Sequence, residues 1–243
     1  DTLMKVLLEK GGGVIIPIPT FSYYEIITII LGGRPVFVKR DRNFGISASK
    51  LVSKVGKNTK VIFLCSPNNP TGNQMSAEEV GEIASRAENC AVMVDEAYVE
   101  FASFSVVSLL REHENLIVLR SFSKAFALAG LRIGYAIVPE EIGEIYMKAS
   151  PPFAVNRLGM IAATEALRDR KYLRKTIALI GEGREFLRRL IPFRTFPSEA
   201  NFVAVDTAPM RAGDVCTRLL KEGIIVRDCS SFSAGITTAM RAR

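Results

Sequence analysis

The sequence has few of the residues that build metal centres or histidine-dependent active sites. Its 243 residues include a single histidine, His113, and four cysteines without a CxxC pair. These counts argue against a zinc cluster and against a Ser-His catalytic triad, and we expect no metal. The cysteines are far apart in the chain, at Cys65, Cys90, Cys216 and Cys229. Buried thiols in a reducing cytoplasm are the simplest interpretation.

Long apolar runs are missing too. No stretch approaches the ~20 apolar residues of a membrane-spanning helix, and the start resembles no secretory signal. A hydrophobic content of 48% instead indicates a buried globular core. The net charge of +7 does not by itself favour nucleic acid, because Lys and Arg are scattered and Asp41 interrupts their densest group, residues 39–42. Anionic substrates account for the excess equally well.

The first two-thirds of the chain alternates short β-branched runs with longer amphipathic stretches. One helix is expected over residues 2–9, before Gly11–Gly13, and another begins at the capping box of Ser76 and Glu79. The predicted strands are residues 14–17, 35–39, 60–66, 91–96, 116–120 and 133–138. This alternation predicts an α/β fold with a doubly wound, mostly parallel sheet, whose ligands lie beyond the carboxyl ends of the strands.

Pro151 and Pro152 break this pattern. Helical sequence follows to about residue 190, and then a strand (201–206), a helix (211–222) and a strand (224–228) are expected. We therefore predict three parts: a large α/β domain over 1–150, connecting helices over 151–190, and an incomplete small α+β domain over 191–243. The chain starts at Asp1 and stops at Arg243 without a helix ending, so we expect a segment with both ends missing.

Four motifs carry candidate chemistry, and most of their polar groups follow predicted strands. They are the turn 65–72 (CSPNNPTG), the segment 94–101 (VDEAYVEF), the segment 121–134 (SFSKAFALAGLRIG), and Arg227 with Arg241 beyond it. Taken singly, each has a structural explanation as a turn, a cap or a solvated cation. Together they supply an amine, a carboxylate, a phenol, hydroxyls and guanidinium groups. Pyridoxal phosphate requires this set of groups.

The motif 121–134 resembles the cofactor-lysine signature of fold-type I pyridoxal-phosphate-dependent aminotransferases. Its core, residues 123–132 (SKAFALAGLR), is especially similar to the histidinol-phosphate aminotransferase branch. The resemblance covers effectively the whole chain, with the motifs in family order. It implies the large domain of that fold, with the small C-terminal domain beside it.

The resemblance implies a role for each residue around the cofactor ring. Lys124 would carry the cofactor as a Schiff base and then move the proton from the substrate Cα to the cofactor C4′. Asp95 would keep the pyridine nitrogen protonated, so that the ring draws electrons. Tyr98 and Asn69 would contact the ring oxygen, and Asn69 would also border the substrate. Phe21 matches the position whose aromatic ring stacks on the pyridine.

The resemblance also implies how anionic groups are held. Ser121, Ser123 and Arg132 would bind the cofactor phosphate. Arg241 would bind the substrate α-carboxylate, and Arg227 the substrate phosphate. Relatives add a Gly-rich loop at a helix N-terminus to the phosphate site, and that loop would lie before Asp1.

The implied reaction converts L-histidinol phosphate and 2-oxoglutarate into imidazole-acetol phosphate and L-glutamate, a step of histidine biosynthesis. By resemblance we expect a cytoplasmic homodimer with its active site at the subunit interface, acting on small molecules rather than on nucleic acid or membranes. Three alternatives stay open: a threonine-phosphate decarboxylase-like enzyme of cobalamin synthesis, an aromatic or aspartate aminotransferase, and a non-enzymatic binding domain.

Overall fold

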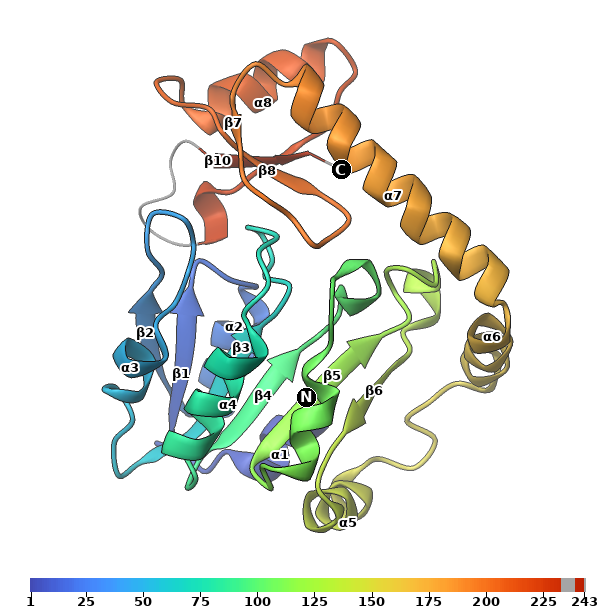
Figure 1. Cartoon of the computed structure of the whole chain (residues 1–243). Coiled ribbons are helices and arrows are strands. Elements are labelled where there is room, and N and C mark those ends of the chain that lie inside the picture. Colours follow the sequence, from blue (N-terminus) through green and yellow to red (C-terminus); the bar gives the residue numbers. More distant parts are fainter. Residues whose placement is uncertain (233–238, 243) are drawn as a thin grey trace.

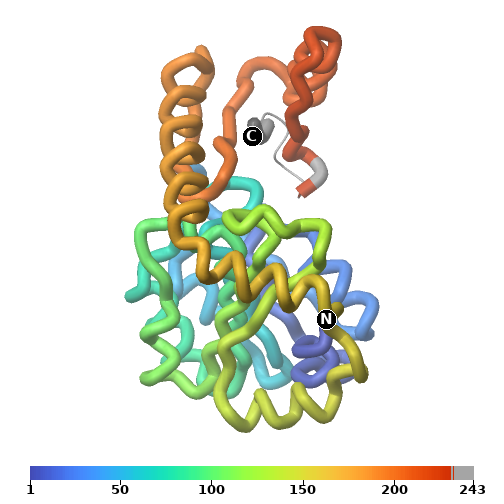
Figure 2. Tube along the Cα trace, turned by 90° about the vertical axis from the view of Figure 1, so that its right-hand side faces the viewer, coloured from blue at the N-terminus to red at the C-terminus, as the bar shows by residue number. Residues whose placement is uncertain are grey.

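The computed structural model describes residues 1–232 and the backbone of 239–242. A six-stranded sheet forms the larger part, and a four-stranded sheet lies beyond the carboxyl ends of its parallel strands (Figure 1). Helix α7 (Arg170–Leu190) runs from the larger part to the smaller one in both views (Figures 1 and 2). Among the described residues, every helix is too short or too polar to cross a bilayer.

The large sheet has the order β2-β1-β3-β4-β5-β6. Its first five strands are parallel, and β6 runs antiparallel to β5. Their bounds are Gly13–Ile18 (β1), Arg34–Lys39 (β2), Thr59–Cys65 (β3), Ala91–Asp95 (β4), Leu116–Ser121 (β5) and Gly134–Ile137 (β6). The chain moves outward from β1 to β2 and then returns to β3 on the other side of β1. The topological switch point, where ligands bind in open α/β sheets, therefore lies between β1 and β3.

Helices cover both faces of this sheet. Its strands alternate their side chains, so that Ile62 and Leu64 pack under α3 and α4, whereas Val61 and Phe63 pack under α1, α2 and α5. The helix bounds are Thr2–Leu7 (α1), Tyr23–Ile30 (α2), Ala48–Val52 (α3), Ala77–Arg86 (α4) and Glu140–Ala149 (α5). This burial on both faces explains why the central strands are almost wholly apolar in sequence.

The predicted capping box is present at the start of α4. The Ser76 hydroxyl accepts from the Glu79 backbone N–H at 3.1 Å, and the Glu79 carboxylate accepts from the Ser76 N–H at 2.9 Å. The first helix is shorter than predicted, because α1 ends at Leu7. Gly11 does adopt the left-handed conformation (φ 83°), but in the turn that follows the helix end.

The small sheet is antiparallel, with the order β7-β8-β10-β9. Its strands are Arg194–Thr195 (β7), Val203–Asp206 (β8), Arg227–Asp228 (β9) and Ala239–Ala242 (β10), and α6 (Arg157–Arg168) and α8 (Ala212–Lys221) complete this half of the chain. The predicted strand 224–228 was too long, since only its last two residues pair with β10. Ile224 and Ile225 stay largely exposed before it. The predicted domain boundaries remain predictions.

Candidate active site

Three adjacent strands deliver the predicted cofactor residues to one edge of the large sheet. Asp95 ends β4 and lies opposite Cys65, the last residue of β3, while Asn69 stands in the turn that follows β3. Lys124 follows the end of β5, the neighbour of β4 on its other side. Parallel strands end at the same edge, and the polar groups therefore gather there.

Lys124 lies near enough to Asp95 at this edge for their charges to interact. Burial raises the pKa of Asp95 above its ordinary value, and the Lys124 ammonium is near enough to oppose that rise. The Lys124 Nζ also lies 5.2 Å from the centroid of the Tyr98 ring. Tyr98 is itself buried, with its ring edge-on to Phe202 at 5.3 Å between centroids. An amine, a carboxylate and a phenol thus share one site.

Both oxygens of Asp95 are held by hydrogen bonds. The Tyr24 hydroxyl donates to Oδ2 at 2.6 Å, and the backbone N–H of Ala97 donates to Oδ1 at 3.0 Å. These bonds favour the ionised carboxylate. Our sequence analysis named Phe21 but missed Tyr24. The available signal was helical spacing, because Tyr24 follows Phe21 at i+3 where α2 begins.

A buried amide joins the three loops around the switch point. The Asn68 oxygen accepts from the Thr20 hydroxyl at 2.8 Å and from Arg40 Nη2 at 3.3 Å. Its nitrogen donates to the Pro19 carbonyl at 3.1 Å and to the Thr71 hydroxyl at 2.6 Å. These contacts fix the loops after β1, β2 and β3 relative to one another. The next residues along two of these loops are Phe21 and Asn69.

Phe21 and Asn69 differ in exposure. The Phe21 ring is 40% exposed and stands edge-on to Tyr24 at 5.6 Å, whereas Asn69 is buried. Phe21 is therefore partly accessible, with its ring beside that of Tyr24. Arg40, part of the charged group 39–42 in the sequence, is instead buried under these loops, and sequence reasoning missed its structural role.

The loop from Ser121 to Arg132 is held in an unusual conformation. The Ser121 hydroxyl accepts from the Ser123 N–H at 3.0 Å. Arg132 has φ 54° and ψ 45°, and Ala127 has φ 58°, in the left-handed region that non-glycine residues rarely adopt. Such strain is commonly found at ligand clamps. The Arg132 side chain is exposed and donates to the Ala129 carbonyl at 3.0 Å.

The two predicted substrate arginines belong to the small sheet. Arg227 lies on β9, exposed, with its guanidinium carbon 5.6 Å from the centroid of the Phe232 ring. The backbone of Arg241 lies opposite Arg227 in the register of β10 and β9. The side chain of Arg241 lies outside the described residues. The structure thus places Arg227 in the half of the chain that lies beyond the carboxyl edge (Figure 1).

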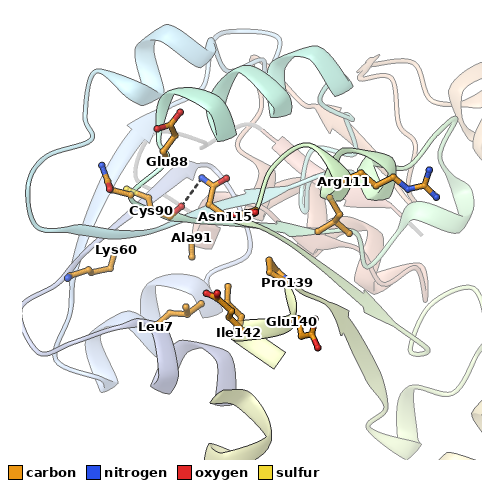
Figure 3. Close-up of a pocket in the computed structure, with 14 residues that line it drawn as sticks. Leu7, Lys60, Glu88, Cys90, Ala91, Arg111, Asn115, Pro139, Glu140 and Ile142 are labelled. Atoms are coloured by element: carbon orange, nitrogen blue, oxygen red, sulfur yellow. Dashed lines mark hydrogen bonds between the residues drawn. The ribbon is translucent and has the colours of Figure 1, made fainter. Parts of the chain in front are cut away.

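A separate cavity of about 770 Å³ lies at the opposite, amino edge of the large sheet (Figure 3). Lys60, Ala91 and Asn115, near the starts of β3, β4 and β5, line it together with residues of α5. The Asn115 amide nitrogen already donates to three backbone carbonyls, those of Ala84, Ala87 and Cys90. This cavity holds none of the predicted site residues, and we do not assign the active site to it.

Glu100, downstream of Tyr98, predicts a pH-dependent stability. Burial raises its pKa from the ordinary 4.5 to about 7, and among the described residues no hydrogen-bond partner reaches its Oε2. Because the folded-state pKa is raised, the stability that depends on the neutral carboxyl is present below about pH 4.5 and is lost as the pH rises through 7. Glu100→Gln cannot ionise, and we expect it to be more stable than the wild type by about 1–3 kcal/mol at pH 8.

Urea unfolding of the full-length protein at pH 5 and pH 8 checks this expectation. The gain should shrink towards zero at pH 5, where the wild-type carboxyl is protonated. Glu88→Gln, at an exposed position, serves as the matched control and should show no such gain. An equal effect of Glu100→Gln at both pH values would contradict the prediction.

Comparison with known proteins decides the family. The sequence model of aminotransferase class I and II matches residues 1–242. The chain belongs to this family. Aminotransferases of this class depend on pyridoxal phosphate. A curated relative named histidinol-phosphate aminotransferase, from Methanococcoides burtonii, is 49% identical over 238 residues, which are 98% of this chain and 66% of the relative.

Solved structures agree on the fold. The histidinol-phosphate aminotransferase of Clostridium acetobutylicum superposes with a TM-score of 0.91 at 27% identity, over 99% of this chain and 74% of that one. The histidinol-phosphate aminotransferase of Sinorhizobium meliloti, solved in complex with pyridoxal-5'-phosphate, superposes with a TM-score of 0.90 at 28% identity. The match covers 99% of this chain and 68% of that one. The chain spans just under two thirds of the length of the curated relatives it matches first.

Proposed function

We propose that the full-length protein is a pyridoxal-phosphate-dependent aminotransferase that converts L-histidinol phosphate and 2-oxoglutarate into imidazole-acetol phosphate and L-glutamate. The observation that carries this proposal is the meeting of Lys124, Asp95 and Tyr98 at the carboxyl edge of the sheet. The names of the relatives support the choice of substrate.

The donor set at this edge fits pyridoxal phosphate. When bound, the cofactor supplies an aldehyde that reacts with amines and a ring that withdraws electrons. Lys124 would provide the amine that holds it, and would then take the proton from the substrate Cα and deliver it to the cofactor C4′. Asp95, anchored through both oxygens, keeps a proton on the ring nitrogen by its charge. Tyr98 and Asn69 donate towards the ring oxygen, and Phe21 offers its face to the ring.

The loop that follows β5 supports a phosphate site. Ser121 and Ser123 provide hydroxyl groups, and Arg132 provides a planar guanidinium group that suits the phosphate geometry. The left-handed backbone at Arg132 is an observation in favour of this role, since a strained non-glycine residue needs a compensating function.

A substrate that bears both a carboxylate and a phosphate needs two cationic anchors. We assign the substrate phosphate to Arg227 and the α-carboxylate of amino-acid substrates to Arg241. The pairing of β9 with β10 supports a shared location, because Arg227 and Arg241 are directly opposite in register. For the acceptor 2-oxoglutarate, the same two anchors would hold its two carboxylates.

A substrate panel on full-length enzyme tests the proposed reaction. Histidinol phosphate, threonine phosphate, aromatic amino acids and aspartate are each offered with 2-oxoglutarate, and both glutamate and carbon dioxide are measured. We expect glutamate to form fastest with histidinol phosphate, without carbon dioxide. Release of carbon dioxide from threonine phosphate without glutamate would establish a decarboxylase instead. A preference for aromatic amino acids or aspartate would establish another aminotransferase.

The proposal extends to assembly and location. We propose a homodimer in the reducing cytoplasm, with the large, connecting and small parts divided at about residues 150 and 190. Strongly exposed apolar side chains at Met147 (73%), Phe153 (99%) and Leu158 (74%) support a covered face in this region. The thiols of Cys65, Cys90 and Cys216 suit a reducing compartment.

A further inference from the structure

Tyr24 is built into the layer directly behind the candidate active site. It is 4% exposed, near the start of α2, and its ring stacks on Phe63 with centroids 4.4 Å apart and planes 10° from parallel. The stack fixes the direction of the ring, and the hydroxyl at its tip lies 2.6 Å from Asp95 Oδ2. A phenylalanine would fill the same space and make the same stack. The hydroxyl therefore has a function that packing does not explain.

In this hydrogen bond the Tyr24 hydroxyl is always the donor and the Asp95 carboxylate the acceptor. Burial raises the pKa of Tyr24 well above its ordinary value, so that the phenol stays protonated and acts as a donor at working pH. A hydroxyl that donates to a carboxylate stabilises the ionised form of that carboxylate. Burial acts in the opposite direction on Asp95. The phenol thus offsets part of the cost of keeping a charge at this position.

Other groups around the pair do not replace the phenol. The Cys65 thiol, on β3, has a pKa that burial raises to about 12, and it therefore stays neutral. Lys124 acts on Asp95 from the loop after β5, Glu96 is the next residue along β4, and Arg40 acts on Tyr24 from the end of β2. Once Lys124 is used to hold the cofactor, its ammonium charge is no longer available in the same form. The Tyr24 hydroxyl is then a constant, neutral support for the carboxylate.

We propose that Tyr24 is a positioning residue of this enzyme, whose hydroxyl keeps Asp95 ionised and fixed in direction, as an anionic partner of the cofactor's ring nitrogen would need to be. The catalytic meaning of this inference rests on the proposed function. The hydrogen bond between Tyr24 and Asp95 is itself independent of that function, and the two can be tested separately.

The test compares Tyr24→Phe with Tyr23→Phe in the full-length protein. Tyr23 is a matched control, because its hydroxyl also donates to an aspartate, Asp1, at 2.7 Å, but at an exposed position. In the cofactor-free protein at pH 7, Tyr24→Phe should raise the unfolding equilibrium constant roughly tenfold or more. In the Asp95→Asn background, the same change should raise it by only about threefold or less.

The pH dependence adds a readout that a packing role would not change. Because the folded-state pKa of Asp95 is raised, the protein loses stability as the pH rises from about 4 through that pKa. Removal of the phenol, which lowers this pKa, makes the loss of stability larger. The difference in unfolding free energy between Tyr24→Phe and wild type should therefore shrink below about pH 4.

The holoenzyme gives the functional readout. Tyr24→Phe should lower kcat by roughly 10²-fold with little change in KM, and should shift the pH profile of kcat, whereas Tyr23→Phe should do neither. Equal effects of Tyr24→Phe with Asp95 present or replaced, or an unchanged pH profile, would overturn the inference. If instead the wild-type protein binds no cofactor, the proposed function fails. The coupling between Tyr24 and Asp95 is then still decided by the unfolding measurements on the cofactor-free protein.

Discussion

Replacing Lys124 by alanine is expected to remove the visible absorption of bound pyridoxal phosphate and to abolish transamination by the full-length enzyme. Lys124 provides the only amine that we place beside both Asp95 and Tyr98 in the described part of the chain. Without it, the cofactor loses its covalent attachment and the substrate Cα loses its base. Loss of proton transfer alone costs roughly 10²–10⁴-fold in rate. Absorbance spectra and glutamate formation measure the two effects.

Two further variants separate chemistry from charge and from folding. Lys124→Arg keeps a cation beside Asp95 but cannot act as the nucleophile or base, and should be as inactive as Lys124→Ala. Lys148→Ala changes an exposed lysine on α5 and should behave as wild type. Borohydride reduction followed by peptide mass spectrometry should locate the cofactor on the peptide that contains Lys124. An unchanged spectrum in Lys124→Ala would remove this residue from its assigned role.

Replacing Arg227 by alanine should lower kcat/KM selectively for phosphorylated substrates. A charge-assisted, bidentate contact to phosphate contributes roughly 10–100-fold in kcat/KM. We therefore expect a loss of that size with histidinol phosphate, and a change within about threefold with unphosphorylated histidinol. The comparison of kcat/KM for these two substrates measures the effect.

The controls for Arg227 test the nature of the contact. Lysine at this position keeps the charge but loses the planar fork, and Arg227→Lys should recover only part of the lost selectivity. Arg218→Ala removes an exposed arginine from the nearby helix α8 and should leave both substrates unaffected. Equal losses on phosphorylated and unphosphorylated substrates would argue against a phosphate anchor at Arg227.

Much of the large sheet could be predicted from the sequence, because burial on both faces leaves a strong local pattern. The apolar runs that begin near residues 60, 91 and 116 became β3, β4 and β5, with ends that differ by one residue. Helix α2 was harder to identify, because Ile26, Ile29 and Ile30 on its exposed side hide the amphipathic pattern. Strand β9 was over-extended, since apolar residues at 224 and 225 suggested pairing that the sheet does not provide.

The site divides in the same way. Asp95 ends a strand, and Lys124 and Asn69 stand in the turns after its two neighbours. Local sequence and the parallel-sheet rule therefore place all three at the same edge. Tyr24 and Arg40 were not predicted, because their hydrogen bonds to Asp95 and Asn68 join residues that are 71 and 28 positions apart in the sequence. For Tyr24 the local sequence offers only its spacing from Phe21, and for Arg40 it offers no signal of a buried contact.

The hydrogen bonds of Asn68 limit which residues can replace it in related sequences. Its side-chain oxygen accepts twice and its nitrogen donates twice, all within a fully buried site. Aspartate would lose both donors, serine could not span the three loops, and glutamine would be too long. We therefore expect natural variation to retain asparagine at this position while the surrounding loops drift, since only concerted replacement of Thr20, Arg40 and Thr71 would accommodate another residue.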